Sequence, residues 1–401
     1  MSAPTVPSIE LRGTVHPAFE AVRTAFAENF AQRNELGAAC CIYHQGEKVV
    51  DLWGGVRDPA TASPWQADTM TLIFSATKGL SAMTLAVAHA RGWLDYDERV
   101  ATYWPEFAHN GKEAITVRQL LAHQAGLFGF HAPVDKTVVA DLDRLAAIMA
   151  AETPAWPPGE RQAYHGISLG FYQGELLRRI DPQHRTLGQF FQEEIAAPLG
   201  LDLYIRLPAD IPNDRLAPLQ LANPIKNLLE LPLLAALSAL NPRSVFSRSL
   251  IYNPGTLLAL DDEHIYARNL EVPSGGGVGT ARSIAAAYSV FATDGAALGL
   301  RRATLDALAA PPIPPRRGFF DYCMRGDIRF SLGFMKPAPD WSFASPAAFG
   351  APGAGGSLAY ADPENGVAYA YICNRMGRSH NDPRDLALRQ ALAQSLQRVT
   401  A

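Results

Sequence analysis

Near the start of the chain, over residues 15–35, apolar residues recur every three or four positions. This period predicts a helix with one buried face. The apolar residues on that face are Phe19, Val22, Phe26 and Phe30. Two short β-prone runs follow at 39–43 and 48–53, and the residues between them, 44–47, favour a turn. The pattern therefore predicts a helix followed by a β-hairpin.

Beyond the hairpin, the helical period returns. A strongly apolar helix is predicted from Ser75 to about Arg91, where Gly92 ends it. Residues 127–270 are rich in helix signals that prolines interrupt. Residues 222–260 alternate apolar stretches with prolines, which predicts short helices and loops that form a lid over a pocket. The helices expected from residue 117 onward cover residues 117–122, 141–151, 169–179 and 187–199.

The last part of the chain regains β character. Strands at both ends around a helical middle predict a mixed α/β (α+β) fold, an antiparallel sheet flanked by helices with an inserted, mostly helical domain. Residues 1–105 and 272–401 then form the mixed α/β domain, and residues 106–271 form the helical one. The late elements are strands at 330–334, 356–361 and 367–373 and a closing helix at 383–397.

The composition narrows the function. Apolar residues make up 48% of the 401 residues and charged residues 18%, which is typical of a globular protein with a substantial core. The net charge of −4 argues against a nucleic-acid partner, because phosphate binding needs a basic surface. The N-terminus lacks the features of a secretory signal peptide, and no run of about 18 apolar residues occurs. We therefore expect a cytoplasmic protein that does not bind membranes.

The four cysteines indicate neither a disulfide framework nor a metal site. Cys40 and Cys41 are adjacent and would point to opposite faces of a strand, and Cys323 and Cys373 lie far away in the sequence. We expect reduced thiols in the core and no bound metal. A homo-oligomer is compatible with this sequence, which does not determine the oligomeric state.

Ser75 and Lys78 form an S-x-x-K motif at the predicted start of an apolar helix. A serine hydroxyl needs a base to take its proton before it can act as a nucleophile. Lysine three residues later lies on the same helix face, one turn away. Burial lowers the proton affinity of such a lysine, which suits it to act as the base. We predict Ser75 as the nucleophile, against the alternative of a helix cap beside a surface lysine.

Tyr164 and His165 lie in a predicted loop that leads into a helix. A tyrosine at a pocket mouth, paired with a cationic lysine, would ionise in part and relay a proton to the leaving group. The alternative is a structural tyrosine with a satisfied hydroxyl. We assign Tyr164 to catalysis and His165 to substrate binding, and the sequence offers no Ser-His-Asp arrangement that would require the histidine.

A second serine, Ser168, lies in a literal G-x-S-x-G pattern at residues 166–170. In α/β-hydrolases this pattern marks a nucleophile on a sharp turn between a strand and a helix. The preceding residues, 157–165, contain two prolines and a glycine and then a polar stretch, so no strand is predicted there. We therefore interpret Ser168 as the first residue of a helix.

A glycine-rich segment at 349–357 precedes one of the late strands. Glycines let the backbone approach a ligand closely, and a backbone N–H at this edge could join the N–H of Ser75 in an oxyanion hole. The alternative is an ordinary glycine-rich loop.

Together these motifs resemble the serine β-lactamase-like superfamily, in particular class C β-lactamases and the related family VIII carboxylesterases. S-x-x-K falls on Ser75 and Lys78, the Y-x-N motif falls on residues 164–166, and the K-T-G or H-x-G motif falls on residues 351–353. The resemblance extends over about residues 15–395. Supporting segments are residues 120–127, 156–159 and 275–282.

The resemblance implies a β-lactamase/transpeptidase-like fold and a serine hydrolase that forms an acyl-enzyme without a metal or organic cofactor. It places the second oxyanion N–H at about Ala354 and substrate contacts at Ala351 and Gly353. Two positions depart from the family: Ala351 replaces Lys or His, and Gly166 replaces Asn. The lost cation weakens binding of a substrate carboxylate, which favours a small-molecule ester of small to medium acyl chain over a β-lactam. The alternatives are a β-lactamase or D-alanyl peptidase, an acyltransferase, and an inactive binding protein of the same fold.

Overall fold

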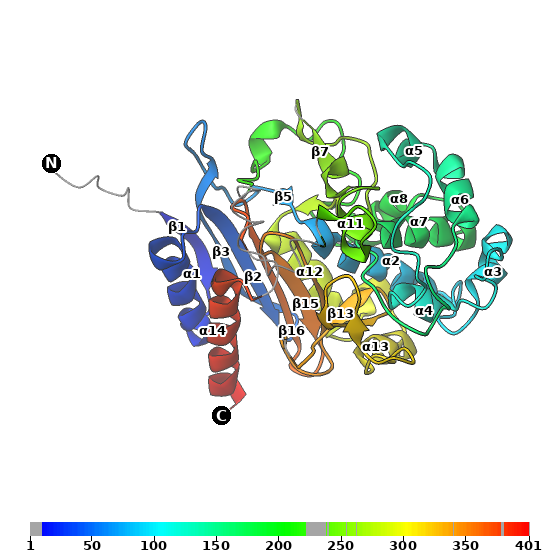
Figure 1. Ribbon diagram of the computed structural model, residues 1–401. Helices are drawn as coiled ribbons and strands as arrows, with labels where there is room; N and C mark the ends of the chain where they lie inside the picture. Colours follow the sequence, from blue (N-terminus) through cyan, green and yellow to red (C-terminus); the bar gives the residue numbers. More distant parts are fainter. Residues whose placement is uncertain are drawn as a thin grey trace.

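The computed structural model describes residues 10–221, 238, 240–253, 255–261, 263–339, 341–377 and 381–400. Its centre is an antiparallel sheet built from both ends of the chain (Figure 1). In spatial order its strands are β1 (Leu11–Val15), β3 (Glu47–Asp58), β2 (Gly37–His44), β16 (Val367–Cys373), β15 (Leu358–Asp362), β14 (Phe349–Pro352), β13 (Phe334–Lys336) and β12 (Arg329–Ser331), and β4 (Ser63–Pro64) pairs with β3. The predicted antiparallel sheet is therefore confirmed.

The predicted hairpin corresponds to β2 and β3, which turn at Gln45 and Gly46, both with positive φ. The predicted strand at 330–334 is wrong in detail. Its residues belong to two strands, β12 and β13, because Leu332 and Gly333 adopt φ of 51° and 89° and reverse the chain. Two short strands, β1 and β14, were not predicted: β14 has no alternation of polar and apolar residues, and β1 alternates over only five residues.

One face of the sheet is covered by two helices from opposite ends of the chain, α1 (Glu20–Gln32) and α14 (Pro383–Thr400). They lie side by side in Figure 1. Phe19, Val22 and Phe26 are buried between α1 and the sheet, as the helical period predicted, and Phe30 is partly buried. The closing helix therefore completes a layer that the N-terminal helix begins.

The other face carries α12 (Ala281–Ala292), which packs on β2, β15 and β16. Next to it lies α2 (Thr77–Ala90), in which every residue except His89 is buried. Helices α7 (Ser168–Ile180) and α8 (Leu187–Phe191) pack against α2 on the side away from the sheet. The apolar helix that follows the S-x-x-K motif is thus a central element of the molecule.

Shorter elements complete the fold. The predicted helix at 187–199 is α8 followed by a π-helical turn, Gln192–Ala196. Of the predicted lid at 222–260, residues 222–237, 239 and 254 lie outside the described residues. The remaining helices are α3 (Val100–Tyr103), α4 (Val117–Leu121), α5 (Lys136–Ala140), α6 (Leu142–Ala151), α11 (Val245–Leu250) and α13 (Arg302–Ala309), and the remaining strands are β5 (Thr71–Leu72), β6 (Leu203–Tyr204), β7 (Leu260–Asp261), β8 (Ile265–Tyr266), β9 (Val278–Gly279), β10 (Phe320–Asp321) and β11 (Gly326–Asp327).

Among the helices that the structure describes, none combines the length and the apolar character needed to cross a membrane. The division of the chain into residues 1–105 with 272–401 and residues 106–271 stays a prediction.

Candidate active site

Ser75 lies in a tight 3-10 turn, Phe74–Ala76, directly before α2. Phe74 has φ of 46°, a left-handed conformation that costs a bulky residue about 1–3 kcal/mol. The neighbouring chain holds this turn in place: Ile73 N donates to Gly277 O at 2.9 Å, and Gly277 N donates to Thr77 Oγ1 at 2.8 Å. The Ser75 side chain is therefore fixed at a strained turn, where it lines a pocket.

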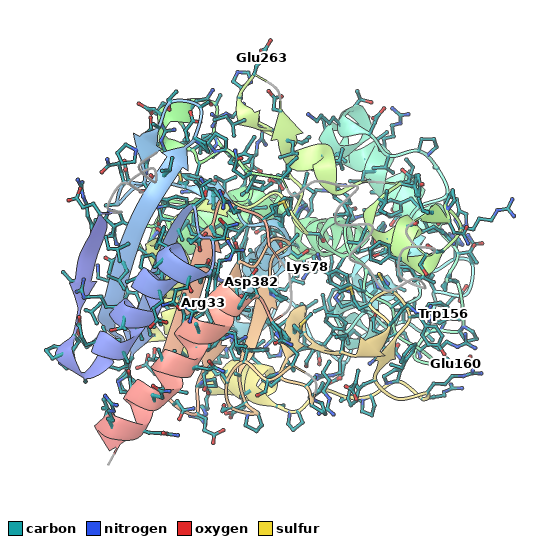
Figure 2. All side chains as sticks on the ribbon, turned by 60° about the vertical axis from the view of Figure 1, so that its left-hand side comes forward. Arg33, Lys78, Trp156, Glu160, Glu263 and Asp382 are labelled. Atoms are coloured by element: carbon teal, nitrogen blue, oxygen red, sulfur yellow. The ribbon has the colours of Figure 1, made fainter. Side chains whose placement is uncertain are left out.

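Lys78 is buried in the middle of the molecule (Figure 2) and is only 3% exposed. Its Nζ lies 3.4 Å from Ser75 Oγ and donates to two backbone carbonyls, Gly166 O at 2.5 Å and Ser274 O at 2.9 Å. No ion pair within the described parts of the chain involves this lysine. Burial holds the pKa of Lys78 well below the ordinary range of lysine, so its neutral form is accessible.

Tyr164 packs against both groups. Lys78 Nζ lies 4.6 Å from the centroid of its ring, and Tyr164 lines the same pocket as Ser75. Burial raises the pKa of Tyr164, although the nearby Ser75 hydroxyl opposes this shift. The resting phenol is therefore neutral, in contrast to the partial ionisation that pairing with a cationic lysine would give.

Gly353 brings the segment after β14 against the turn of Ser75. A Cβ on Gly353 would lie 2.3 Å from the Ile73 carbonyl oxygen, so only glycine fits this approach. Gly353 N donates to Ser357 O at 2.7 Å. The next residue, Ala354, lines the same pocket as Ser75, and its N–H has no acceptor among the described residues. This arrangement leaves one backbone donor of the segment available to a ligand.

Two predicted substrate contacts lie away from this pocket. Ala351 is buried, and its Cβ lies 3.6 Å from the position that a Cβ on Gly79 of α2 would take. Side chains alternate along a strand, so Ala351 faces α2 while its neighbour Pro352 lines the pocket. The register of β14, which the sequence did not reveal, determines this orientation.

His165 is also buried, and both of its ring nitrogens bind the backbone. Nδ1 donates to Ala163 O at 2.6 Å, and Nε2 accepts from Leu127 N at 3.0 Å. Burial lowers the pKa of His165 to about 4, which keeps the ring neutral. These hydrogen bonds show that His165 stabilises the neighbouring backbone. His165 is not among the described residues that line the pocket beside Ser75.

Ser168 is the first residue of α7, as the sequence analysis interpreted it. Its side chain is 1% exposed, and its Oγ donates to Leu127 O at 2.8 Å. A buried hydroxyl engaged in this way is not available to attack a substrate.

The pocket beside Ser75 has a cavity volume of about 90 Å³. None of its described lining residues is charged. Leu250, Met324 and Met335 were missed by the sequence analysis, because they come from three distant segments that carry no motif. The lining residues are Ser75, Tyr164, Leu250, Met324, Met335, Pro352, Gly353 and Ala354.

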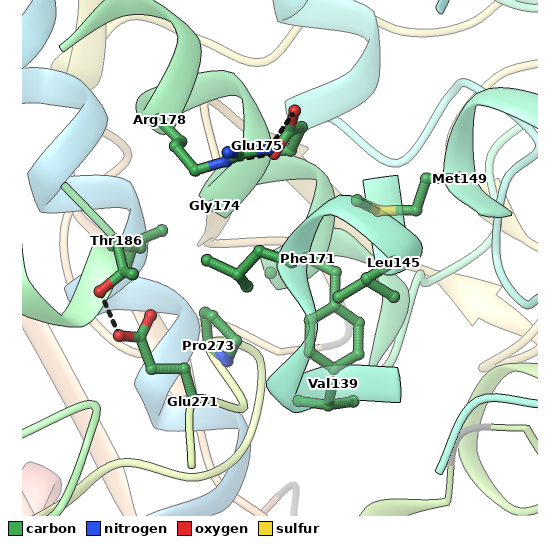
Figure 3. Close-up of a pocket in the computed structure, with 13 residues that line it drawn as sticks. Val139, Leu145, Met149, Phe171, Gly174, Glu175, Arg178, Thr186, Glu271 and Pro273 are labelled. Carbon is green, nitrogen blue, oxygen red and sulfur yellow. Dashed lines mark hydrogen bonds and ion pairs between the residues drawn. The ribbon is translucent and has the colours of Figure 1, made fainter. Parts of the chain in front are cut away.

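A second cavity lies against α7 (Figure 3). Its walls are largely apolar, with Val139, Leu145, Met149 and Phe171 among them. Both of its acidic residues are already engaged. Glu271 accepts hydrogen bonds from the Thr186 hydroxyl and the Gly188 N–H at the start of α8, and Glu175 forms ion pairs with Arg178 and Arg179. Neither carboxylate of the described cavity lining is therefore free to react. In the described ranges no group of three His, Cys, Asp or Glu residues could hold a metal ion.

An antiparallel sheet covered by helices on both faces, with Ser75, Lys78 and Tyr164 gathered beside β14, defines the class of serine hydrolases with the β-lactamase fold. The chain belongs to the beta-lactamase family, whose model matches residues 22–394.

Three relatives illustrate the similarity. The esterase/beta-lactamase LipL of Mycobacterium tuberculosis is 34% identical over 370 residues, which are 91% of this chain and 83% of that protein. The crystal structure of a family VIII carboxylesterase is 33% identical and superimposes with a TM-score of 0.83, over 96% of this chain and 100% of that one. A penicillin-binding protein homologue from Caulobacter crescentus is 34% identical with a TM-score of 0.78, over 96% of this chain and 100% of that one.

Proposed function

We propose that the protein is a carboxylesterase that cleaves small to medium acyl esters through an acyl-serine intermediate on Ser75. One observation carries the proposal: Lys78, a buried lysine without an anionic partner among the described residues, lies 3.4 Å from a serine that opens into an uncharged pocket. Relatives named as an esterase/beta-lactamase and as a family VIII carboxylesterase support the same reaction.

Lys78 acts as the general base in this proposal. A neutral amine has two N–H bonds and one lone pair. The two N–H groups of Lys78 donate to the carbonyls of Gly166 and Ser274. These carbonyls direct the lone pair toward Ser75 Oγ. The distance of 3.4 Å is long for a hydrogen bond, and such catalytic contacts commonly tighten when the substrate binds.

Acylation begins when the Ser75 hydroxyl proton moves to Lys78 Nζ and Oγ attacks the ester carbonyl carbon. The carbonyl oxygen becomes an oxyanion, which accepts hydrogen bonds from the N–H groups of Ser75 and Ala354. The carbon–oxygen bond to the alcohol then breaks. The Tyr164 hydroxyl gives its proton to the departing oxygen and is reprotonated from Lys78, which leaves an acyl-serine and a neutral lysine.

Deacylation repeats these steps with water as the nucleophile. Water gives a proton to the Lys78 and Tyr164 pair, attacks the acyl carbon, and the Ser75 oxygen leaves with a proton. No step uses a metal ion or an organic cofactor.

The uncharged pocket favours neutral esters over β-lactams. A β-lactam carries a carboxylate near its scissile bond, and none of the described lining residues is a cation that would bind it. The β-lactamase or D-alanyl peptidase reaction is therefore the second candidate. It is supported by the relatives named as an esterase/beta-lactamase and as a penicillin-binding protein homologue.

A panel of p-nitrophenyl esters of graded acyl length, measured beside the chromogenic cephalosporin nitrocefin, tests the proposal. We expect kcat/KM to peak for a short or medium acyl chain and to exceed the value for nitrocefin by at least about a hundredfold. Nitrocefin turnover equal to that of the best ester would support a β-lactamase instead. Acyl transfer to an added alcohol that outpaces hydrolysis would support an acyltransferase.

We also propose a cytoplasmic location. The four cysteines, Cys40, Cys41, Cys323 and Cys373, are free and buried, which suits a reducing compartment. Fractionation of cells that express the protein, with a cytoplasmic and a secreted marker, tests this location.

A further inference from the structure

Ser249 lies near the end of α11, far in sequence from every catalytic motif, and is 1% exposed. Its single hydroxyl makes two backbone hydrogen bonds. Ser249 Oγ accepts from Gly166 N at 2.8 Å and donates to Tyr164 O at 2.6 Å. The hydroxyl therefore joins both ends of the three-residue segment 164–166.

That segment supplies two parts of the site. Tyr164 provides the phenol that lines the pocket beside Ser75, and Gly166 provides the carbonyl that accepts from Lys78 Nζ at 2.5 Å. A shift of the segment would move the phenol and the carbonyl together. It would also turn the lone pair of Lys78 away from Ser75, because the Gly166 carbonyl fixes one of the two Lys78 N–H directions.

Gly166 packs closely against the end of α11. A Cβ placed on Gly166 would meet Leu250 Cδ2 at 2.3 Å, Ser249 O at 2.8 Å and Ser249 Oγ at 2.9 Å. Loss of the hydroxyl would leave the Gly166 N–H and the Tyr164 carbonyl without this hydrogen-bond partner. Because unpaired buried polar groups are costly, the segment would shift toward other hydrogen-bond partners.

We propose that Ser249 is a positioning residue that holds Tyr164 and the lysine-binding carbonyl of Gly166 in catalytic register. This inference rests on the proposed function of Ser75 and Lys78. It assigns α11 a task in the chemistry besides its contribution of Leu250 to the pocket wall.

The test compares Ser249→Ala with Ser249→Thr, which retains a hydroxyl. The matched control is Ser395→Ala, which removes another buried serine hydroxyl, one that donates within α14 to Ala391 O at 2.9 Å. We measure kcat and KM for the best p-nitrophenyl ester, together with the thermal midpoint. Misplacement by about 1 Å can cost roughly a hundredfold in rate, so we expect kcat of Ser249→Ala to fall about 10–100-fold with KM within about threefold.

Ser249→Thr should recover most of the wild-type kcat. Ser395→Ala should retain the wild-type kcat even if its thermal midpoint falls as much as that of Ser249→Ala. If Ser249→Thr does not fold, the kcat of Ser249→Ala is compared with that of Ser395→Ala. A lower kcat in Ser249→Ala, when the two variants have the same thermal midpoint, would then support the positioning role. A Ser249→Ala enzyme with wild-type kcat, or one whose activity falls only in proportion to its folded fraction, would overturn the inference. The proposed function fails separately, through an active Ser75→Ala variant, and so the two failures can be told apart.

Discussion

Gly353 and Ile73 meet so closely that a Cβ on Gly353 would lie 2.3 Å from the Ile73 carbonyl oxygen. The contact joins the end of β14 to the turn that carries Ser75, two residues after Ile73. It therefore sets the distance between the serine and the backbone of the third motif, where Ala354 lines the same pocket.

We expect Gly353→Ala to force these two segments apart. Overpacking of this kind costs roughly 1–3 kcal/mol of stability, and kcat should fall by about a hundredfold or more because the two backbone N–H groups separate. Gly326→Ala is the matched control, since a Cβ on Gly326 would meet nothing within 4 Å. Steady-state kinetics and thermal unfolding of both variants give the result, and wild-type kcat in Gly353→Ala would show that the close approach is not needed.

The pH dependence of kcat/KM should report the buried lysine. The active form of Lys78 is the neutral amine, which is populated above its pKa, and burial holds that pKa well below the ordinary range of lysine. Activity toward a neutral ester should therefore rise with pH and reach its plateau well below about 10.4, the ordinary lysine value. A profile that still rises steeply above that value would indicate that Lys78 is not the base.

Leu250 should set the acyl length that the pocket accepts, because it lines the pocket beside Ser75. Each buried CH₂ contributes about 0.8 kcal/mol, or roughly fourfold in kcat/KM. We expect Leu250→Ala to shift the optimum toward longer p-nitrophenyl esters by one or more methylenes. Ile313→Ala, at a residue that is 57% exposed and not among the described lining residues, should leave the optimum in place. An unchanged optimum in Leu250→Ala would mean that the acyl group binds elsewhere.

Ala351→His introduces the histidine that relatives carry at this position, but we expect that its side chain will not contact the substrate. The Ala351 side chain faces Gly79, and a Cβ on Gly79 would also lie 1.9 Å from the Tyr288 hydroxyl, so this space is full. We expect a stability loss of roughly 1–3 kcal/mol from overpacking. The ratio of nitrocefin to ester kcat/KM should stay within about threefold of wild type. A tenfold or larger rise in that ratio would place residue 351 at the substrate after all.

The sequence predicted those parts of the site that lie within one local segment. Ser75 and Lys78 are three residues apart, and the apolar character of α2 predicted the burial of the lysine. The orientation of Ala351 could not be predicted, because it depends on the register of β14 against β15. The same holds for Ser249, Leu250 and Met335, which reach the site only through tertiary packing.

The elements of the fold that follow from a local sequence pattern were likewise predicted, and those that depend on a special backbone conformation were not. The amphipathic period of α1 and the β-prone runs of β2 and β3 were sufficient to predict them. The separation of β12 from β13 depends on positive φ at Leu332 and Gly333, and an apolar run does not reveal that turn.

Labelling of the intact protein with a fluorophosphonate, followed by mass-spectrometric mapping of the modified peptide, tests the central claim most directly. Wild-type protein should carry one adduct, on Ser75, and lose ester hydrolysis in proportion to labelling. Ser168→Ala should label and hydrolyse like wild type, because that hydroxyl is buried and donates to Leu127 O. Ser75→Ala should do neither while it keeps its fold. An adduct on Ser168, or ester turnover by Ser75→Ala at the wild-type rate, would contradict the assignment of Ser75 as the nucleophile.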